Sequence, residues 1–268
     1  MASLLSIIAL GFFLGMRHAT DPDHVIAVTT IVSRQRSIAR SAWIGIFWGI
    51  GHTLTILLVG AAIILFGLVI PPRIGLSMEF SVGLMLIVLG IMNVVSFRRS
   101  ISVTALQTQE GLEAVHSHPY NHGDYVHTHL HRHSPEEHLH QPGQTPLDYL
   151  DRGFADKGLY QYFRPLAVGI IHGLAGSAAV ALLVLTTIRN SYWAVAYLLI
   201  FGIGTIAGMM LITMSIASTF QFVGKSRRFS HLLAVASGLL SLAFGLLVAY
   251  QIGFVNGLFT GHPNWTPR

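Results

Sequence analysis

Six long apolar stretches limit what this chain can fold into. Each contains at least 20 residues, the length that an α-helix needs to cross the ~30 Å hydrocarbon layer of a bilayer. Charged residues make up only 10% of the 268 residues, whereas soluble domains carry about 25%. The chain is therefore predicted to be an all-α, polytopic membrane protein with six transmembrane helices. The six segments are residues 3–33, 38–70, 77–97, 165–188, 192–218 and 231–256.

The first segment contains a signal for a break. Its 31 residues would reach ~46 Å as one straight helix, which is more than a bilayer core needs. Asp21-Pro22 favours a new helix start, with Asp at the N-cap and Pro at the first helical position. Pro22 also disfavours helical geometry at Asp21. We predict a half-helix to about Arg17, an unwound turn near the middle of the membrane, and a second half-helix from Pro22.

The break coincides with four side chains of metal-binding type. His18, Asp21, Asp23 and His24 fall within seven residues between apolar flanks. Ionisable groups in a membrane span cost several kcal/mol and are a functional site by default. The alternative is a loop between two short core elements, or a set of paired structural polar residues. An unbroken helix would turn His18 and Asp23 about 140° apart, so the break allows them to share one ion.

Two further histidines lie in apolar segments. His52 follows Gly49-Ile50-Gly51, and His172 lies between Gly169 and Gly173. A single histidine on an apolar face is more often a hydrogen-bonded structural residue than a ligand, but four on three spans favour a shared site. Imidazole with carboxylate suits Ni²⁺, Co²⁺, Zn²⁺ or Mn²⁺, whereas Mg²⁺ and Ca²⁺ prefer oxygen ligands. The predicted metal-binding residues are His18, Asp21, Asp23, His24, His52 and His172.

Residues 98–164 differ from the rest in composition. They are polar and include nine histidines between His116 and His140. Such a tract cannot bury a core and is predicted to be a largely disordered cytoplasmic loop that binds metal ions loosely. The alternatives are a biased linker or a pH-responsive segment. The predicted organisation is a first three-span unit at 1–97, the loop at 98–164, a second unit at 165–256, and a short external tail at 257–268.

The two three-span units resemble each other. Three pairs of glycine patterns occur in the same order in both units, at offsets of 158, 153 and 155 residues. Because each unit has an odd number of spans, the units must have opposite orientations, which is the inverted-repeat arrangement of secondary transporters. The alternative is that small residues recur in any packed membrane helix. The pairs are Gly11/Gly15 with Gly169/Gly173, Gly49/Gly51 with Gly202/Gly204, and Gly83/Gly90 with Gly238/Gly245.

Basic residues predict the orientation. They are concentrated at 34–40, 98–99 and 225–228, and the positive-inside rule assigns these loops to the cytoplasm and both termini to the outside. The formal charge of +5 therefore sets topology and gives no reason to expect a nucleic-acid partner. The chain has no cysteine, which excludes thiolate metal sites and cysteine nucleophiles. We expect a multi-pass protein of a cell inner membrane or plasma membrane.

Two motifs resemble a known family. His18-x₄-Asp23-His24 resembles the signature of the nickel/cobalt transporter (NiCoT) family, and Gly51-His52-Thr53 resembles its second motif. The family's two further acidic motifs are absent, and six spans replace the usual eight. The chain is therefore closer to the shorter, urease-accessory UreH-like branch of the wider NicO group. The resemblance implies a metal permease and suggests nickel-enzyme maturation proteins as partners.

The predicted function is a secondary transporter that moves Ni²⁺, and also Co²⁺, into the cell through the His/Asp site. The first alternative is a Ni²⁺/Co²⁺ exporter that collects metal on the cytoplasmic histidine tract. The second is an intramembrane metalloenzyme or haem protein. A His-Glu-x-x-His motif is absent, and haem bound by His52 and His172 would leave Asp23 unexplained. We expect no enzymatic activity and no resident cofactor.

Overall fold

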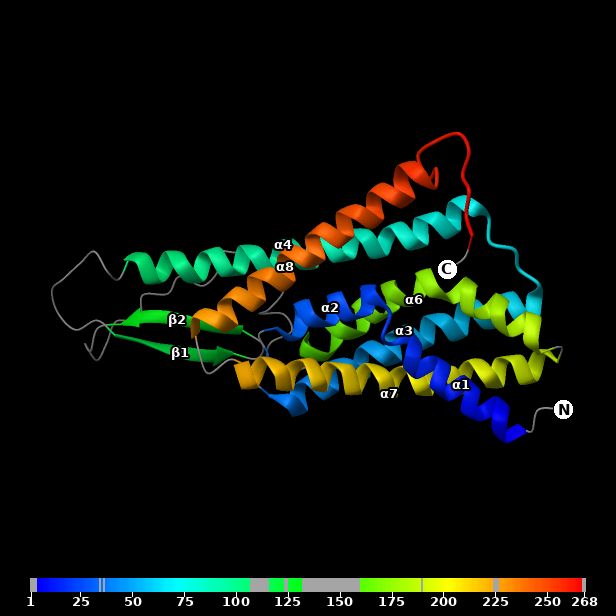
Figure 1. Cartoon of the computed structure of the whole chain (residues 1–268), viewed down its shortest axis with the longest axis horizontal. Coiled ribbons are helices and arrows are strands. Elements are labelled where there is room, and N and C mark those ends of the chain that lie inside the picture. Colours follow the sequence, from blue (N-terminus) through cyan, green and yellow to red (C-terminus); the bar gives the residue numbers. More distant parts are fainter. Residues whose placement is uncertain are drawn as a thin grey trace. The chain divides into compact units, whose positions relative to one another are not determined.

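The computed structural model describes residues 4–33, 35, 37–106, 116–122, 125–131, 160–188, 190–223 and 227–266. The chain divides into two compact units, Met1–Val94 with Pro165–Arg268, and Val95–Arg164. Helices dominate the described residues (Figure 1). The elements are α1 Leu4–His18, α2 Pro22–Val32, α3 Ile38–Phe66, α4 Pro72–Leu106, β1 His116–His122, β2 Tyr125–His131, α6 Tyr160–Thr187, α7 Ser191–Val223, α8 Arg227–Tyr250 and the π-helical turn η1 Gln251–Val255.

Long apolar helices confirm the prediction of a helical membrane protein. Among the described residues, four helices are long and apolar enough to cross a bilayer: Ile38–Phe66, Pro72–Val95, Ser191–Phe222 and Leu232–Val255. These correspond to four of the six predicted segments. The first predicted segment is divided between α1 and α2, which have 15 and 11 residues. At ~1.5 Å per residue, neither is long enough to span alone.

The predicted break is present between α1 and α2. Helix α1 ends at His18, and α2 begins at Pro22. The Asp21 backbone N–H donates to the His18 carbonyl at 3.1 Å, which closes the turn. Asp21 occupies the predicted N-cap position but makes no side-chain capping bond. Its carboxylate instead lies 2.8 Å from Nδ1 of His18, so the side chain acts on the histidine rather than on the helix start.

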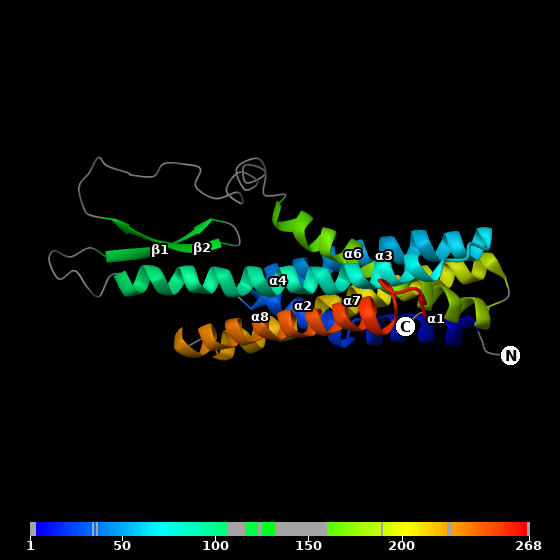
Figure 2. The same ribbon diagram turned by 90° about the horizontal axis from the view of Figure 1, so that it is seen from above.

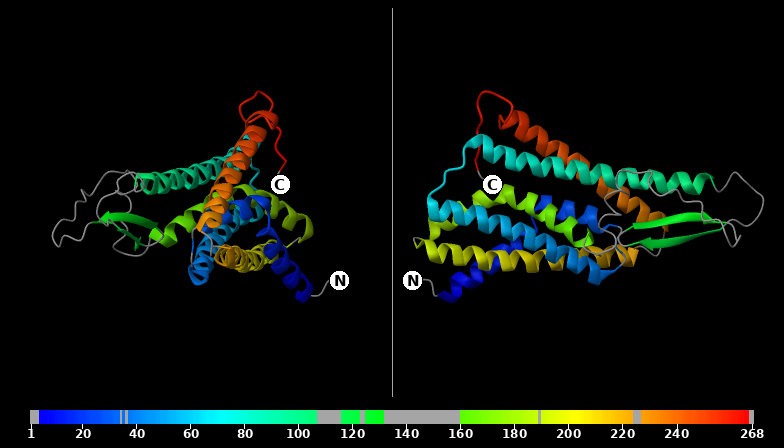
Figure 3. Two further views of the ribbon diagram at one scale, coloured as in Figure 1. Left: turned by 60° about the vertical axis from the view of Figure 1, so that its left-hand side comes forward. Right: turned by 180° about the vertical axis from the view of Figure 1, so that it is seen from behind.

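Glycines bring the helices of the larger unit to backbone contact. Helix α7 packs against both α1 and α3 (Figure 3). Gly15 of α1 faces the Phe201 carbonyl of α7, and Gly204 of α7 faces the Phe12 carbonyl, with no space for a side chain at either position. Helices α4 and α8 run side by side (Figure 2) and approach through Gly90 and Gly238. Small residues at such contacts allow the close packing that stabilises membrane helices.

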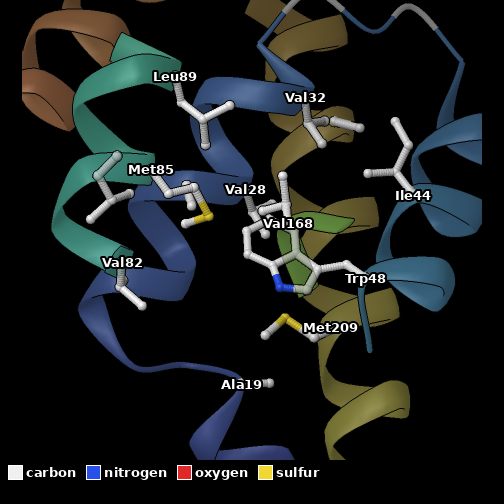
Figure 4. Close-up of a cluster of buried hydrophobic side chains, with 13 residues drawn as sticks. Ala19, Val28, Val32, Ile44, Trp48, Val82, Met85, Leu89, Val168 and Met209 are labelled. Carbon is white, nitrogen blue, oxygen red and sulfur yellow. The ribbon is translucent and has the colours of Figure 1, made fainter. Parts of the chain in front are cut away.

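The apolar core of this unit surrounds α2 (Figure 4). Val28 and Val32 of α2 are fully buried. They pack in one cluster with residues of α3, α4 and α7, including Trp48, Leu86 and Met209. Trp48 is completely inaccessible to solvent, and its ring lies close to the polar residues at the start of α2. Apolar side chains of α3, α4 and α7 therefore pack around α2 and fix its position in the bundle.

A hydrogen-bonded polar cluster joins the second half of α2 to α4 and α8. The Asn93 amide nitrogen lies 3.3 Å from the Thr30 carbonyl oxygen, 3.4 Å from Ser33 Oγ and 3.3 Å from Ser237 Oγ. The Thr30 hydroxyl donates to the carbonyls of Ile26 and Ser237. These side chains are buried. The cluster therefore fixes three helices to one another without a charged group.

The smaller unit contains part of the histidine-rich segment. Strands β1 and β2 pair antiparallel, with His116 opposite His131 and His118 opposite His129. The predicted boundary at residue 98 falls within α4, which continues to Leu106. The predicted second unit begins at residue 165, inside α6. The prediction that residues 98–164 are largely disordered falls mostly on residues outside the described ranges.

Candidate metal centre

Three helices bring three imidazoles together at the break. His18 ends α1, His24 lies in the first turn of α2, and His52 lies near the middle of α3. Nε2 of His18 lies 3.0 Å from Nε2 of His52. One nitrogen from each of the three rings can be chosen so that all lie within 4.8 Å of one another. This spacing is compatible with three imidazoles converging on one metal ion.

A second group shares His24 with the first. It consists of Asp23, His24 and His172 of α6. The two oxygens of Asp23 divide their contacts: Oδ2 lies 3.0 Å from Nε2 of His172, and Oδ1 lies 3.2 Å from Nδ1 of His24. The His24 backbone N–H also donates to Oδ1 at 3.0 Å. Among the described residues, Asp23 is thus the carboxylate that connects α2 with α6.

Asp21 lies outside both three-residue groups. It contacts Nδ1 of His18, the ring nitrogen opposite the one that faces His52. Carboxylates in this position orient a metal-binding imidazole and make it more basic. The exposed fraction of the Asp21 side chain is 48%, against 17% for His18. Asp21 is therefore placed to position His18 rather than to share its inner nitrogen.

Most of the centre is buried, and part of its hydrogen-bonding capacity is unused. His24, His52 and His172 are at most 2% exposed. Four buried nitrogens have no partner among the described residues: Nε2 of His24, Nδ1 of His52, Nδ1 of His172 and Nε1 of Trp48. An unsatisfied buried polar group costs about 1–3 kcal/mol. Several unsatisfied nitrogens in one cluster are better explained by binding of a ligand than by packing of the helices.

Glycines explain how His52 and His172 reach the same place. Gly169 of α6 faces the Trp48 carbonyl, and Gly51 of α3 faces the Leu166 carbonyl, again with no space for a side chain. A Cβ added at Gly173 would lie 2.6 Å from the His52 carbonyl oxygen. Helices α3 and α6 therefore touch through their backbones directly beside both histidines. Larger residues at these positions would separate the two rings.

All six residues predicted from the sequence line one cavity of about 370 Å³. The structure thus brings together every predicted site residue, five of them in the two groups and Asp21 beside His18. The cavity is also lined by Glu79 of α4, which the sequence analysis missed. Glu79 is the one acidic residue in the apolar segment 77–97. The rule that draws attention to ionisable groups in membrane spans would have identified it.

Apolar membrane-length helices and a cavity lined by four histidines and three carboxylates are the features expected of a protein that moves a metal ion across a membrane. Residues 4–258 match the sequence model of the NicO family, described as high-affinity nickel-transport protein, and the chain belongs to this family. It is 37% identical over 256 residues to "Urease accessory protein UreH" of Bacillus sp. (strain TB-90), a match that covers 96% of each chain. No solved structure matches. The predicted resemblance is confirmed, and the family description points to a transporter rather than an enzyme.

Proposed function

We propose that the chain is a secondary transporter that imports Ni²⁺, and also Co²⁺, through the buried His/Asp centre. The main observation is that two groups of metal-binding side chains share His24 inside the helical bundle. Borderline divalent ions of the first transition row bind imidazole with carboxylate. In this proposal the ion is substrate, and the direct ligands are His18, Asp23, His24, His52 and His172.

The two groups suggest how an ion passes through. An ion held by His18, His24 and His52 exchanges one ligand at a time for Asp23 and His172, while His24 is common to both positions. Stepwise exchange avoids a fully unliganded ion in the membrane. Asp21 keeps the His18 ring oriented with Nε2 toward the ion, since it contacts Nδ1.

The glycine contacts support the proposed inverted repeat. Gly15 faces the Phe201 carbonyl, and Gly169 faces the Trp48 carbonyl. Gly169 follows Gly15 by 154 residues and Phe201 follows Trp48 by 153, whereas the sequence pattern matched Gly169 with Gly11. The same offsets relate the contact of Gly204 with Phe12 to that of Gly51 with Leu166. Both of these contacts between the halves thus recur with the roles of the halves exchanged. This is expected of two inverted three-helix units around a central substrate site.

Import also fits the proposed membrane orientation. The basic loops predict that both termini lie outside a cell inner membrane or plasma membrane. The similar UreH protein is named a urease accessory protein, and we propose that this chain likewise supplies nickel to enzyme-maturation proteins.

The test is uptake of ⁶³Ni²⁺ by cells with and without the chain, with efflux from preloaded cells measured alongside. Asp23→Asn is the inactive comparison, because it removes the charge while keeping the size of the side chain. Ser215→Ala is the matched control, since Ser215 is exposed and bonds only within its own helix. Faster efflux without uptake would establish the exporter instead. Absence of nickel movement in either direction would refute the proposal.

A further inference from the structure

The candidate metal centre leaves one half-buried carboxylate of the bundle unexplained. The described part of the chain contains three carboxylate side chains, Asp21, Asp23 and Glu79, and all three line the same cavity. Asp21 and Asp23 contact histidines, whereas Glu79 belongs to neither metal-binding group. Because an acidic residue in a membrane helix is costly, its presence in this cavity calls for a function.

Glu79 lies at the part of the cavity formed by α4, α8 and η1. It is seven residues into α4, or ~10 Å along the helix from Pro72. That end of α4 lies at the same end of the bundle as the start of α1 (Figure 1). The same cavity is also lined by Gln251 of the π-helical turn η1, and π-helical turns are frequent at functional sites. The histidines lie on other helices, at the break.

The C-terminal segment reaches back to Glu79. The indole Nε1–H of Trp265 donates a hydrogen bond to Oε1 of Glu79 at 2.8 Å. The indole ring covers Gly75, one turn before Glu79, so closely that no side chain would fit there. Trp265 also packs with Ile63 of α3. The same tryptophan therefore holds the tail in place and occupies one oxygen of the carboxylate.

We propose that Glu79 is the capture site for a hydrated divalent cation on its way to the histidine centre, and that Trp265 competes with the cation for this carboxylate. The inference rests on the proposed import function and names an earlier position on the same path. A carboxylate can hold a hydrated cation through its water shell before imidazoles replace those waters. When the cation binds, the indole N–H is released and the C-terminal segment loses one of its attachments.

The test compares initial rates of ⁶³Ni²⁺ uptake over a range of concentrations, normalised to the amount of protein in the membrane. Glu79→Gln keeps an oxygen that accepts from Trp265 and removes only the charge. A cleft lined by charges of one sign raises the local concentration of oppositely charged ions ~10-fold or more, and Glu79 is one of three carboxylates in this cavity. We therefore expect KM to rise about tenfold in Glu79→Gln, with the maximal rate nearly unchanged. Glu79→Asp, which keeps the charge, should restore much of the difference.

Trp265→Phe tests whether Trp265 competes with the cation for Glu79 or only anchors the C-terminal segment. It keeps an aromatic ring over Gly75 but removes the donor, so we expect a lower KM at an unchanged amount of protein. Trp193→Phe, at an exposed tryptophan on α7, is the control and should match the parent. Added salt should raise KM of the parent more than that of Glu79→Gln, because ions screen the carboxylate.

Two results would overturn the inference. If Glu79 only anchors the tail, Glu79→Gln will import with the parent's KM, and Trp265→Phe will lose protein rather than gain affinity. An unchanged KM in Trp265→Phe would refute the competition. Failure of the parent chain to import nickel in the same assay is a different outcome, because it refutes the proposed function itself.

Discussion

Helix α2 contributes to two polar clusters, which differ in how completely their hydrogen-bonding groups are paired. At its start, Asp23 and His24 meet His18, His52 and His172, and three of these imidazoles keep a nitrogen without a partner among the described residues. Towards its end, Thr30 and its neighbours form hydrogen bonds with α4 and α8. Since a buried polar group normally finds a partner, the contrast supports the proposal of a ligand site at the start of α2 and a structural connection towards its end.

The chemistry of the side chains explains the difference. An imidazole has two nitrogens on opposite sides of the ring, so the protein can hold one and leave the other to a metal. His18 illustrates this, with Asp21 on Nδ1 and His52 on Nε2. A hydroxyl group is shorter and finds a backbone carbonyl within one turn, as Thr30 does at Ile26. The Asn93 amide finds its partners on α2 and α8. The first cluster can therefore bind an ion, whereas the second is complete without one.

The largest effect is expected from Asp23→Ala. Asp23 is the link between His24 and His172, and its loss removes both a ligand and the contact that orients two others. We expect nickel uptake to fall to background while the protein remains in the membrane. The measurement is ⁶³Ni²⁺ uptake per unit of membrane-inserted protein. Near-normal uptake would show that the ion does not depend on this site. It would also show that the two clusters do not differ in function.

The sequence predicted the parts of this site that depend on neighbouring residues. The break followed from Asp21-Pro22, since proline fixes the local backbone and cannot continue the preceding helix. Four long apolar helices followed from hydropathy. The prediction that the Asp21 side chain caps α2 was wrong. Its carboxylate instead pairs with Nδ1 of His18, which lies one turn earlier at 2.8 Å.

Contacts between distant segments could not be predicted in the same way. Trp265 bonds Glu79 across 186 positions, and neither residue carries a motif that names the other. The contact of Gly173 with the His52 backbone depends on which helices become neighbours. Local patterns report glycine positions but not the partner each glycine meets. Pairing of helices is decided by the packing of the whole bundle.

The second prediction compares His52→Ala with His172→Ala, one from each three-residue group. Loss of a residue that merely supports a ligand lowers metal affinity ~10–100-fold, and we expect at least this from either change. Binding is measured by metal titration and absorption spectra on purified protein lacking residues 116–140, so that other imidazoles do not mask the result. Thr205→Val on α7 is the control, because Thr205 bonds only its own helix. An unchanged spectrum in His52→Ala would assign His52 to packing.

The third prediction concerns the satisfied cluster. Asn93→Ala removes the amide that joins α2, α4 and α8, and membrane hydrogen bonds contribute up to ~1.7 kcal/mol each. We expect the free energy of unfolding to fall by about 1–2 kcal/mol, as measured by denaturant titration in detergent. Nickel uptake per folded molecule should stay near that of the parent. Loss of nickel binding in a stably folded variant would show that the second cluster also belongs to the ion path.

The smallest effect is expected from deleting residues 116–140, which carry a third set of imidazoles outside both clusters. These histidines can concentrate ions near the protein, but neither group of buried ligands includes any of them. If the loop histidines contribute less than ~1 kcal/mol to the apparent binding free energy of the ion, the half-saturating concentration changes by less than about fivefold. We therefore expect the concentration dependence of ⁶³Ni²⁺ transport to shift within that limit while the maximal rate is kept. Replacing the same residues with a Gly/Ser segment of equal length separates loss of imidazole from loss of chain length. Abolished transport in both well-expressed variants would mean that the polar segment, rather than the break between α1 and α2, contains the essential ligands.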